Sequence, residues 1–252
     1  MRLTILGSGT LVPVTHRNNP GYLLDIGPET IMLDCGSGSI RQIARAGRGV
    51  EEVRRLFLSH GHLDHINDLM PLLFTRKYSG IAAESLKPLI IHIHPDLLPV
   101  IDVMKTVFAS QIDDAPQPYR IETLSPGSYH FPGYNIRVFP ASHSTGSIIL
   151  EFHDERGKWL VYSGDTELCD ELVEASQSAD CVLIECSFPD SMNVQGHMSP
   201  GKISRLIRNT RPRRVILTHL YPQNDRDNLL SEIGSFEYTQ VTIAADLAVF
   251  EI

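Results

Sequence analysis

The stretch Ser59-His60-Gly61-His62-Leu63-Asp64-His65 places three imidazoles and a carboxylate directly after an apolar run, Leu56-Phe57-Leu58. His60 and His62 are two residues apart, so on an extended segment both rings point to the same side. Asp64 and His65 are expected to begin a helix, which would direct them to a second point close by. Imidazole and carboxylate groups are the ligands that suit zinc and related metals. The stretch therefore predicts two metal ions, one held by each pair.

Three more ligand-type residues follow apolar runs further along the chain. Each is expected at the end of a strand, where loops gather ligands: His143 in Ala141-Ser142-His143-Ser144, Asp165 in Ser163-Gly164-Asp165-Thr166 and His219 in Leu217-Thr218-His219-Leu220. Any one of these histidines could be a core or surface residue without a metal. The set argues for a metal site, because all of its members would have to fall at strand ends by coincidence.

This order of ligands resembles the metallo-β-lactamase superfamily, whose signature is His-x-His-x-Asp-His, and the resemblance extends over the whole chain. It implies one metal held by His60, His62 and His143, a second held by Asp64, His65 and His219, and a bridge between them from Asp165. Two divalent ions are therefore expected as cofactors, with Zn²⁺ foremost and Mn²⁺ or Fe as alternatives, since this ligand set accepts all three.

Short β-rich runs alternate with single helices in both halves of the chain, separated by glycine and proline. Strands are expected at residues 3–6, 22–26, 30–33, 56–58 and 89–93, then one after another from 121 to 165, including 136–139, 147–152 and 159–163, and then at 181–185 and 215–217, followed by a final strand pair. Helices are expected at residues 40–46, 66–78, 97–109, 167–176 and 201–209, with a loop at 112–118. The pattern predicts an α/β fold, a four-layer α/β/β/α sandwich of two mixed sheets with outer helices, as a single domain over 1–252.

Charge and composition limit the partners of the protein. The chain has 22 basic and 30 acidic residues, a net charge of −8, which disfavours stable binding of duplex nucleic acid. A small anionic substrate stays open, because bound metal ions would reverse the local sign of charge. The four cysteines form no Cys-x-x-Cys pair, and no apolar run is long enough for a membrane span. A cytoplasmic protein with reduced thiols is expected, and a homodimer is an open alternative because similar proteins are frequently dimers.

Ligand identity narrows the branch of the superfamily that the sequence resembles. His62 stands where a glutamate would indicate the di-iron oxygen-reducing branch, and Asp165 stands where a cysteine would indicate antibiotic-degrading enzymes. Phosphodiesterases, thioester hydrolases of the glyoxalase II kind and lactonases remain. Lactonases carry a tyrosine shortly after the bridging aspartate, whereas Thr166 and Glu167 follow here.

Two further segments favour the phosphodiesterases. Glu185-Cys186-Ser187 and His197-Met198-Ser199 are similar to the Glu-Ala-Thr and His-Ser-Thr segments of ribonuclease Z, and to segments of the phosphodiesterase of the carbon-phosphorus lyase pathway. The resemblance implies that His197 contacts the phosphate or protonates the leaving oxygen, oriented by Glu185. Ser199 and Pro200 would also place His197 ahead of a helix amino terminus, whose free N–H groups favour an anion. The alternative is a partly buried strand-end Glu185 and an ordinary loop histidine.

The spacing between ligands argues against transfer RNA as the substrate. Bacterial ribonuclease Z carries a long arm between the third histidine and the bridging aspartate, but here only 22 residues separate His143 from Asp165. The carbon-phosphorus lyase phosphodiesterase has a cysteine-rich insertion near its amino terminus, and residues 11–22 contain no cysteine. Processing of tRNA 3′ ends is thus a minor alternative, and the particular substrate stays open.

We therefore predict a metal-dependent phosphodiesterase acting on a small or cyclic phosphodiester or an RNA end. A hydroxide bridging the metals would attack phosphorus, Asp64 would orient or deprotonate it, and His197, held by Glu185, would assist the leaving oxygen. A thioester or lactone hydrolase is the main alternative, and a non-catalytic metal-binding interaction protein is the third.

Two other sequence patterns are interpreted as ordinary surface structure and not as functional sites. The arginines at 205, 208, 211, 213 and 214 are expected to form a solvated helix face and turn, and a partner for them stays open. Residues 7–10, Gly-Ser-Gly-Thr, lack the third glycine of a dinucleotide loop and are expected to form a turn near the rim of the site.

Overall fold

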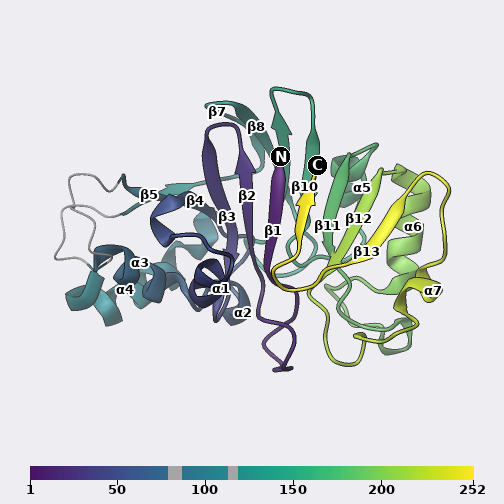
Figure 1. Ribbon diagram of the computed structural model, residues 1–252, viewed down its shortest axis with the longest axis horizontal. Helices are drawn as coiled ribbons and strands as arrows, with labels where there is room; N and C mark the ends of the chain where they lie inside the picture. Colours follow the sequence, from purple (N-terminus) through teal and green to yellow (C-terminus); the bar gives the residue numbers. More distant parts are fainter. Residues whose placement is uncertain (79–86, 113–118) are drawn as a thin grey trace.

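The protein consists of two seven-stranded sheets that face each other, with helices on the two outer sides (Figure 1). The structure is a computed structural model that describes residues 1–78, 87–112 and 119–252. In Figure 1 the helices α1 to α4 lie on one side of the molecule and α5 to α7 on the other. The predicted four-layer α/β/β/α sandwich is confirmed.

Both sheets are mixed, and they share one pattern: antiparallel strands on one side and four parallel strands on the other. The first sheet has the order β14-β1-β2-β3-β4-β5-β6, with β3 to β6 parallel. Its strands are β1 (Arg2–Gly7), β2 (Gly21–Ile26), β3 (Glu29–Cys35), β4 (Val53–Phe57), β5 (Leu89–Ile93), β6 (Tyr119–Thr123) and β14 (Val249–Glu251).

The second sheet has the order β13-β12-β11-β10-β9-β8-β7, with β10 to β13 parallel. Its strands are β7 (Gly127–Phe131), β8 (Tyr134–Pro140), β9 (Ile148–Asp154), β10 (Trp159–Tyr162), β11 (Cys181–Glu185), β12 (Arg214–Thr218) and β13 (Gln240–Ile243). Because the carboxyl ends of parallel strands meet at one edge of a sheet, the loops after β4, β10, β11 and β12 can converge on one site.

The helices cover the outer faces of the sheets. They are α1 (Ser39–Arg45), α2 (Leu63–Ile66), α3 (Leu69–Lys77), α4 (Leu98–Ile112), α5 (Asp170–Ser176), α6 (Pro200–Thr210) and α7 (Leu229–Ile233), with 3-10 turns η1 (Val50–Glu52), η2 (Pro95–Leu97) and η3 (Asp190–Met192). Among the described residues, none of these helices has the length and apolar character needed to cross a membrane.

Alternation along the central strands explains why the sheets are covered on both faces. In β11, Cys181 and Leu183 pack in the core between the sheets, whereas Val182 and Ile184 pack under the outer helices. Successive side chains of a strand point to opposite faces, so a strand buried on both faces reads as a continuous apolar run. Every residue of β11 is accordingly buried.

The structure corrects several element predictions at the ends of the chain and near its middle. The expected final strand pair is wrong, because β13 pairs with β12 whereas β14 pairs with β1 in the other sheet. The short helix α7 was not predicted. The helix expected at 66–78 is α3, Leu69–Lys77, and a separate short helix, α2, precedes it. Of the expected loop at 112–118, Ile112 ends α4 and residues 113–118 lie outside the described residues.

Candidate metal centre

The ends of several strands bring the seven predicted ligands together. One group is formed by His60, His62, His143 and Asp165, and a second by Asp64, His65 and His219, with the ligand atoms of each group within 4.8 Å of one another. His60 follows β4, Asp165 follows β10, and His219 follows β12. Asp64 and His65 lie in the first turn of α2, as predicted, although this short helix begins one residue earlier, at Leu63.

Asp165 lies between the two groups. Its Oδ2 atom is 3.7 Å from His60 Nε2 and 3.5 Å from His219 Nε2, and its Oδ1 atom is 3.4 Å from His65 Nε2. Within the first group, His143 Nε2 is 3.0 Å from His62 Nδ1. One carboxylate is therefore adjacent to imidazoles of both groups, which is the placement that a bridging ligand needs.

The donor atoms at the centre fit a pair of cations. His60 Nε2, His65 Nε2 and Asp165 Oδ1 are buried without a hydrogen-bond partner among the described residues. Buried polar atoms are normally paired, so three such atoms aimed at one point indicate a place for a ligand. Imidazole nitrogens and carboxylate oxygens suit Zn²⁺ and its neighbours, and all three are ligand atoms of that kind.

Asp34 fixes the ring of His65. This aspartate is the next-to-last residue of β3, has a left-handed conformation with φ of 53°, and is fully buried. Its Oδ2 accepts a hydrogen bond from His65 Nδ1 at 2.7 Å and another from the hydroxyl of Tyr162. The amide and hydroxyl of Ser59 donate to the same carboxylate, each at 2.7 Å. Because Nδ1 is occupied in this way, Nε2 of His65 is free to bind a metal.

Ser187 and Glu185 hold two further histidines. His219 Nδ1 is 2.9 Å from the hydroxyl of Ser187, which in turn bonds Glu185. The same glutamate lies 3.0 Å and 3.1 Å, through its two oxygens, from Nδ1 of His197. Glu185 is buried and also accepts from the amide of Thr166 at 2.8 Å. His219 is thereby presented through Nε2, and His197 is held beside the centre, 4.0 Å from Asp165.

Gly196 positions His143. The Nδ1 atom of His143 is 2.9 Å from the carbonyl oxygen of Gly196, so Nε2 again faces the centre. The amide of Gly196 donates to Glu167 at 3.0 Å, and Lys202 binds the next carbonyl, that of His197, at 2.8 Å. Gly196 has φ of 80°, and a Cβ at this position would lie 2.9 Å from His143 Nδ1. Only glycine fits here without displacing the ligand.

Burial and neighbouring charges set the protonation states of the ligands. Burial lowers the pKa of His60 and of His143, which keeps both rings neutral. Although burial opposes ionisation of Asp165, the imidazoles of His219 and His65 lower its pKa well below the ordinary value. Burial likewise opposes protonation of His65, but Asp165 and Asp34 raise its pKa. The carboxylates therefore favour positive charge at this point, which a divalent cation also supplies.

The expected anion site at the start of α6 is already taken by the protein. Ser199 is the N-cap residue as predicted, but its side chain makes no capping bond and bonds Asp190 instead. The amide of Gly201 donates to both oxygens of Asp190, at 3.0 Å each. The prediction that free N–H groups there favour a substrate anion is therefore wrong for Gly201, because a carboxylate from η3 occupies its amide.

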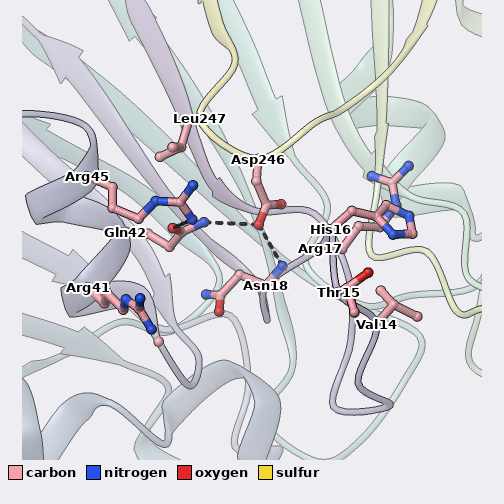
Figure 2. A pocket seen from close by; sticks show the side chains of 11 residues that line it. Val14, Thr15, His16, Arg17, Asn18, Arg41, Gln42, Arg45, Asp246 and Leu247 are labelled. Carbon is pink, nitrogen blue, oxygen red and sulfur yellow. Dashed lines mark hydrogen bonds between the residues drawn. The ribbon is translucent and has the colours of Figure 1, made fainter.

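The first loop borders the centre, as expected for a turn near its rim. The carbonyl of Ser8 accepts a bond of 3.1 Å from the amide of Leu220, next to His219. On the other side, Asp246 accepts from the amide and hydroxyl of Ser8, from the amide of Asn18 and from the side chain of Gln42. Figure 2 shows Asp246 between Asn18 and Gln42 in a pocket of about 550 Å³. Four donors thus anchor this loop.

Most of the remaining histidines have partners elsewhere. His92 is buried and stacks on Phe57 at 4.5 Å, so it belongs to the core. Three other histidines bond polar side chains outside the centre: His16 with Asp225, His130 with Asn135 and His153 with Glu151. The described residues place none of these in a group that could hold a metal.

The basic cluster on and after α6 has local partners. Arg208 and Arg211 lie over the rings of Phe236 and Tyr238. Arg213 pairs with Asp180 at 3.3 Å, and Arg214 donates to a backbone carbonyl near the carboxyl terminus. These contacts agree with a solvated helix face and turn.

Several residues that shape the centre were not predicted from the sequence. They are Asp34, Ser187 and Gly196, which orient ligands, and Phe188 and Tyr221, whose stacked rings lie beside His197. Burial raises the pKa of Tyr221 to about 12, so its hydroxyl stays protonated. The run Asp34-Cys35-Gly36 after a strand was the available signal for Asp34, since a polar residue ending a buried strand needs a partner.

The fold and the site are those of the α/β/β/α metallohydrolases: two facing mixed sheets, outer helices, and a cluster of imidazoles and carboxylates at the strand ends. Comparison with known families agrees: residues 29–220 match the family described as Beta-lactamase superfamily domain. The chain belongs to the metallo-β-lactamase superfamily, and we class it as a hydrolase.

Individual relatives extend over the whole chain. A protein of Methanosarcina acetivorans named Ribonuclease Z is 25% identical over 309 residues, covering 100% of this chain and 98% of its own. The metallo-β-lactamase fold protein YhfI from Bacillus subtilis has a similar structure, with a TM-score of 0.82, 23% identity and coverage of 99% and 98%. A diphosphatase from the PhnP family matches with a TM-score of 0.73, 18% identity and coverage of 100% and 97%.

Proposed function

We propose that the protein is a phosphodiesterase that acts on a small or cyclic phosphodiester or an RNA end, with His60, His62, His143, Asp64, His65, His219 and Asp165 as ligands of two divalent ions, Zn²⁺ foremost. Two bound ions would activate water and neutralise the charge of the phosphate. The observation that carries the proposal is His197, an additional histidine beside the ligand cluster that is held by a buried glutamate.

The side chains of the protein have distinct parts in this reaction. Although burial opposes ionisation of Asp64, the hydrogen bond from His219 and the charge of His65 lower its pKa, so it is an anion that can orient the attacking water. Burial likewise opposes protonation of His197, but the bond to Glu185 raises its pKa. A protonated His197 can donate to the leaving oxygen, and Glu185 keeps Nδ1 engaged so that Nε2 faces the substrate.

The short connection between His143 and Asp165 and the charge of the chain support a small substrate. Between His143 and Asp165 the described chain forms only β9, β10 and their turn, so the site has no arm at this point. The alignment with the Methanosarcina relative spans 309 residues, whereas this chain has 252, so that relative carries segments without a counterpart here. With a net charge of −8, a long polyanion would gain little from the surface outside the centre.

The test is turnover of bis-p-nitrophenyl phosphate by protein loaded with Zn²⁺ or Mn²⁺. We expect His197→Ala to reduce kcat about 10²- to 10⁴-fold, as loss of a general acid does, while metal content stays unchanged. The matched control is His153→Ala, because His153 also pairs with a buried glutamate, Glu151, but lies in β9 away from the ligand groups. Hydrolysis of S-lactoylglutathione or a homoserine lactone without diester turnover would contradict the proposal and favour a thioester or lactone hydrolase.

A further inference from the structure

Phe188 and Tyr221 form a stacked aromatic pair whose position follows from the sheet. In the parallel register of β11 and β12, Glu185 lies beside Thr218, and Phe188 and Tyr221 each come three residues later. The two loops leave the sheet together, since the amide of Tyr221 bonds the carbonyl of Ser187. The ring centroids are 4.3 Å apart with an interplanar angle of 25°, an offset-stacked geometry.

This pair lies beside the catalytic histidine. The Phe188 ring is 5.3 Å from that of His197, edge to face. The Tyr221 ring is 6.5 Å from His197 and 5.8 Å from His219. Both aromatic side chains are only partly buried, whereas His60, His65, Asp165 and His219 are buried. The pair is therefore an apolar wall at the mouth of a site that is otherwise built from polar and charged groups.

The chemistry of the wall differs from that of the centre. Each ring has one face against the other, so the pair presents two outer faces that are not used by the stack. A partly exposed aromatic pair next to a candidate metal centre suits a ligand that joins a planar ring to a phosphate. Every nucleobase has such a face, and stacking on an aromatic side chain does not require a particular base.

From this placement we propose that Phe188 and Tyr221 form a stacking subsite for the base of a nucleoside phosphate whose phosphate lies at the metal centre. The inference rests on the proposed function for the position of the phosphate. It deepens that function by naming the substrate class: a diester that carries a nucleoside on the side of its leaving group, because the pair adjoins His197, the proposed donor to the leaving oxygen.

The test compares two ligands that differ only in the base. Adenosine 5′-monophosphate and ribose 5-phosphate have the same sugar phosphate, and their binding to zinc-loaded protein can be measured by calorimetry. We expect the adenosine ligand to bind about 5- to 150-fold more tightly, the range that stacking of one base contributes. Tyr221→Ala should bring this ratio close to one, whereas Tyr221→Phe should keep it, because the ring and not the hydroxyl provides the face.

The control is Tyr238→Ala, which removes an exposed tyrosine whose ring lies under Arg211 and contacts none of the ligand-type residues, and which should leave the ratio unchanged. Should Tyr221→Ala fail to fold, Phe188→Leu keeps an apolar side chain but removes one ring, and it should lower the ratio as well. Equal affinity for the two ligands in the wild-type protein, or a ratio that survives both substitutions, would overturn the subsite.

This outcome is separate from that of the proposed function. Protein that does not hydrolyse any diester but binds the adenosine ligand preferentially through Tyr221 would refute the phosphodiesterase and retain the subsite. Protein that hydrolyses bis-p-nitrophenyl phosphate but binds both ligands equally would do the reverse.

Discussion

Replacing Asp34 by asparagine should weaken metal binding without touching a ligand. Three donors point at Oδ2 of this carboxylate, namely the hydroxyl of Ser59, the hydroxyl of Tyr162 and Nδ1 of His65, while Oδ1 accepts from the amide of Ser59. The oxygen of an asparagine can occupy only one of the two positions, and the backbone amide of Ser59 cannot turn away. An NH₂ group would therefore face the three donors at the other position.

The two hydroxyls can rotate and accept from this NH₂ group, but His65 cannot do so while Nδ1 carries a proton. If the proton moves to Nε2, that atom, which lies 3.4 Å from Asp165, no longer binds a metal. Loss of such an outer partner costs about 10- to 100-fold in metal affinity, or about 1.4–2.8 kcal/mol. Because Asp34 is fully buried, mispairing should also lower the free energy of unfolding by about 1–3 kcal/mol.

The assay is competition between the protein and a zinc chelator, which yields a dissociation constant for each ion. We expect one of the two ions, that of the group containing His65, to be weakened. Asp246→Asn is the matched control, because this carboxylate also accepts four hydrogen bonds, yet its partners are Ser8, Asn18 and Gln42 and include no imidazole. The reasoning is refuted if Asp34→Asn retains both affinities, or if the control loses as much.

Three further predictions concern the rest of the centre and its border. Gly196→Ala should lower metal content and kcat, because the added Cβ would displace His143. The control Gly157→Ala has a similar φ of 76° and no atom within 4 Å of the added Cβ, so it should lower only the stability of the protein. Equal effects of the two substitutions on metal content would contradict this prediction. The hydrogen bonds from Arg17 lower the pKa of Asp225. The ionised carboxylate therefore stabilises the folded protein above about pH 4, and this stabilisation is lost as the pH falls through the lowered pKa of the folded state. Urea unfolding should accordingly show that the free energy of unfolding decreases less between pH 6 and pH 3 for Asp225→Asn than for the wild type. The same decrease in both proteins would contradict a stabilising role of the Asp225 carboxylate. Removal of metal by chelation should lower Tm by about 5–10 °C for each ion lost, because an ion whose free concentration is about 100 times its dissociation constant contributes about 2.7 kcal/mol. An unchanged Tm in calorimetry would mean that no ion was bound.

The sequence could identify the fold and the cluster of ligand-type residues because their signals are local. The His60 to His65 stretch holds four of the ligand-type residues, and His143, Asp165 and His219 each end a recognisable apolar run. Alternation of side chains and strand-ending turns also indicated most of the strands. The assignment of roles to these residues, by contrast, came from a family resemblance and stays a proposal.

The groups that orient the ligands could not be found in the same way, because they are distant in sequence. Asp34 meets His65 across 31 residues and Tyr162 across 128 residues, and no local pattern connects them. The start of α6 was misread for a related reason. Its local sequence is that of a free helix amino terminus, but Asp190, from a separate turn, takes the amide of Gly201. Likewise, β13 and β14 look like neighbours in sequence but join different sheets.

The most direct measurement is anomalous diffraction from crystals of the metal-loaded protein. The account predicts two peaks about 3.5–4 Å apart, with a carboxylate oxygen of Asp165 in contact with both. A single ion, or ions bound away from His60, His65 and His219, would contradict it.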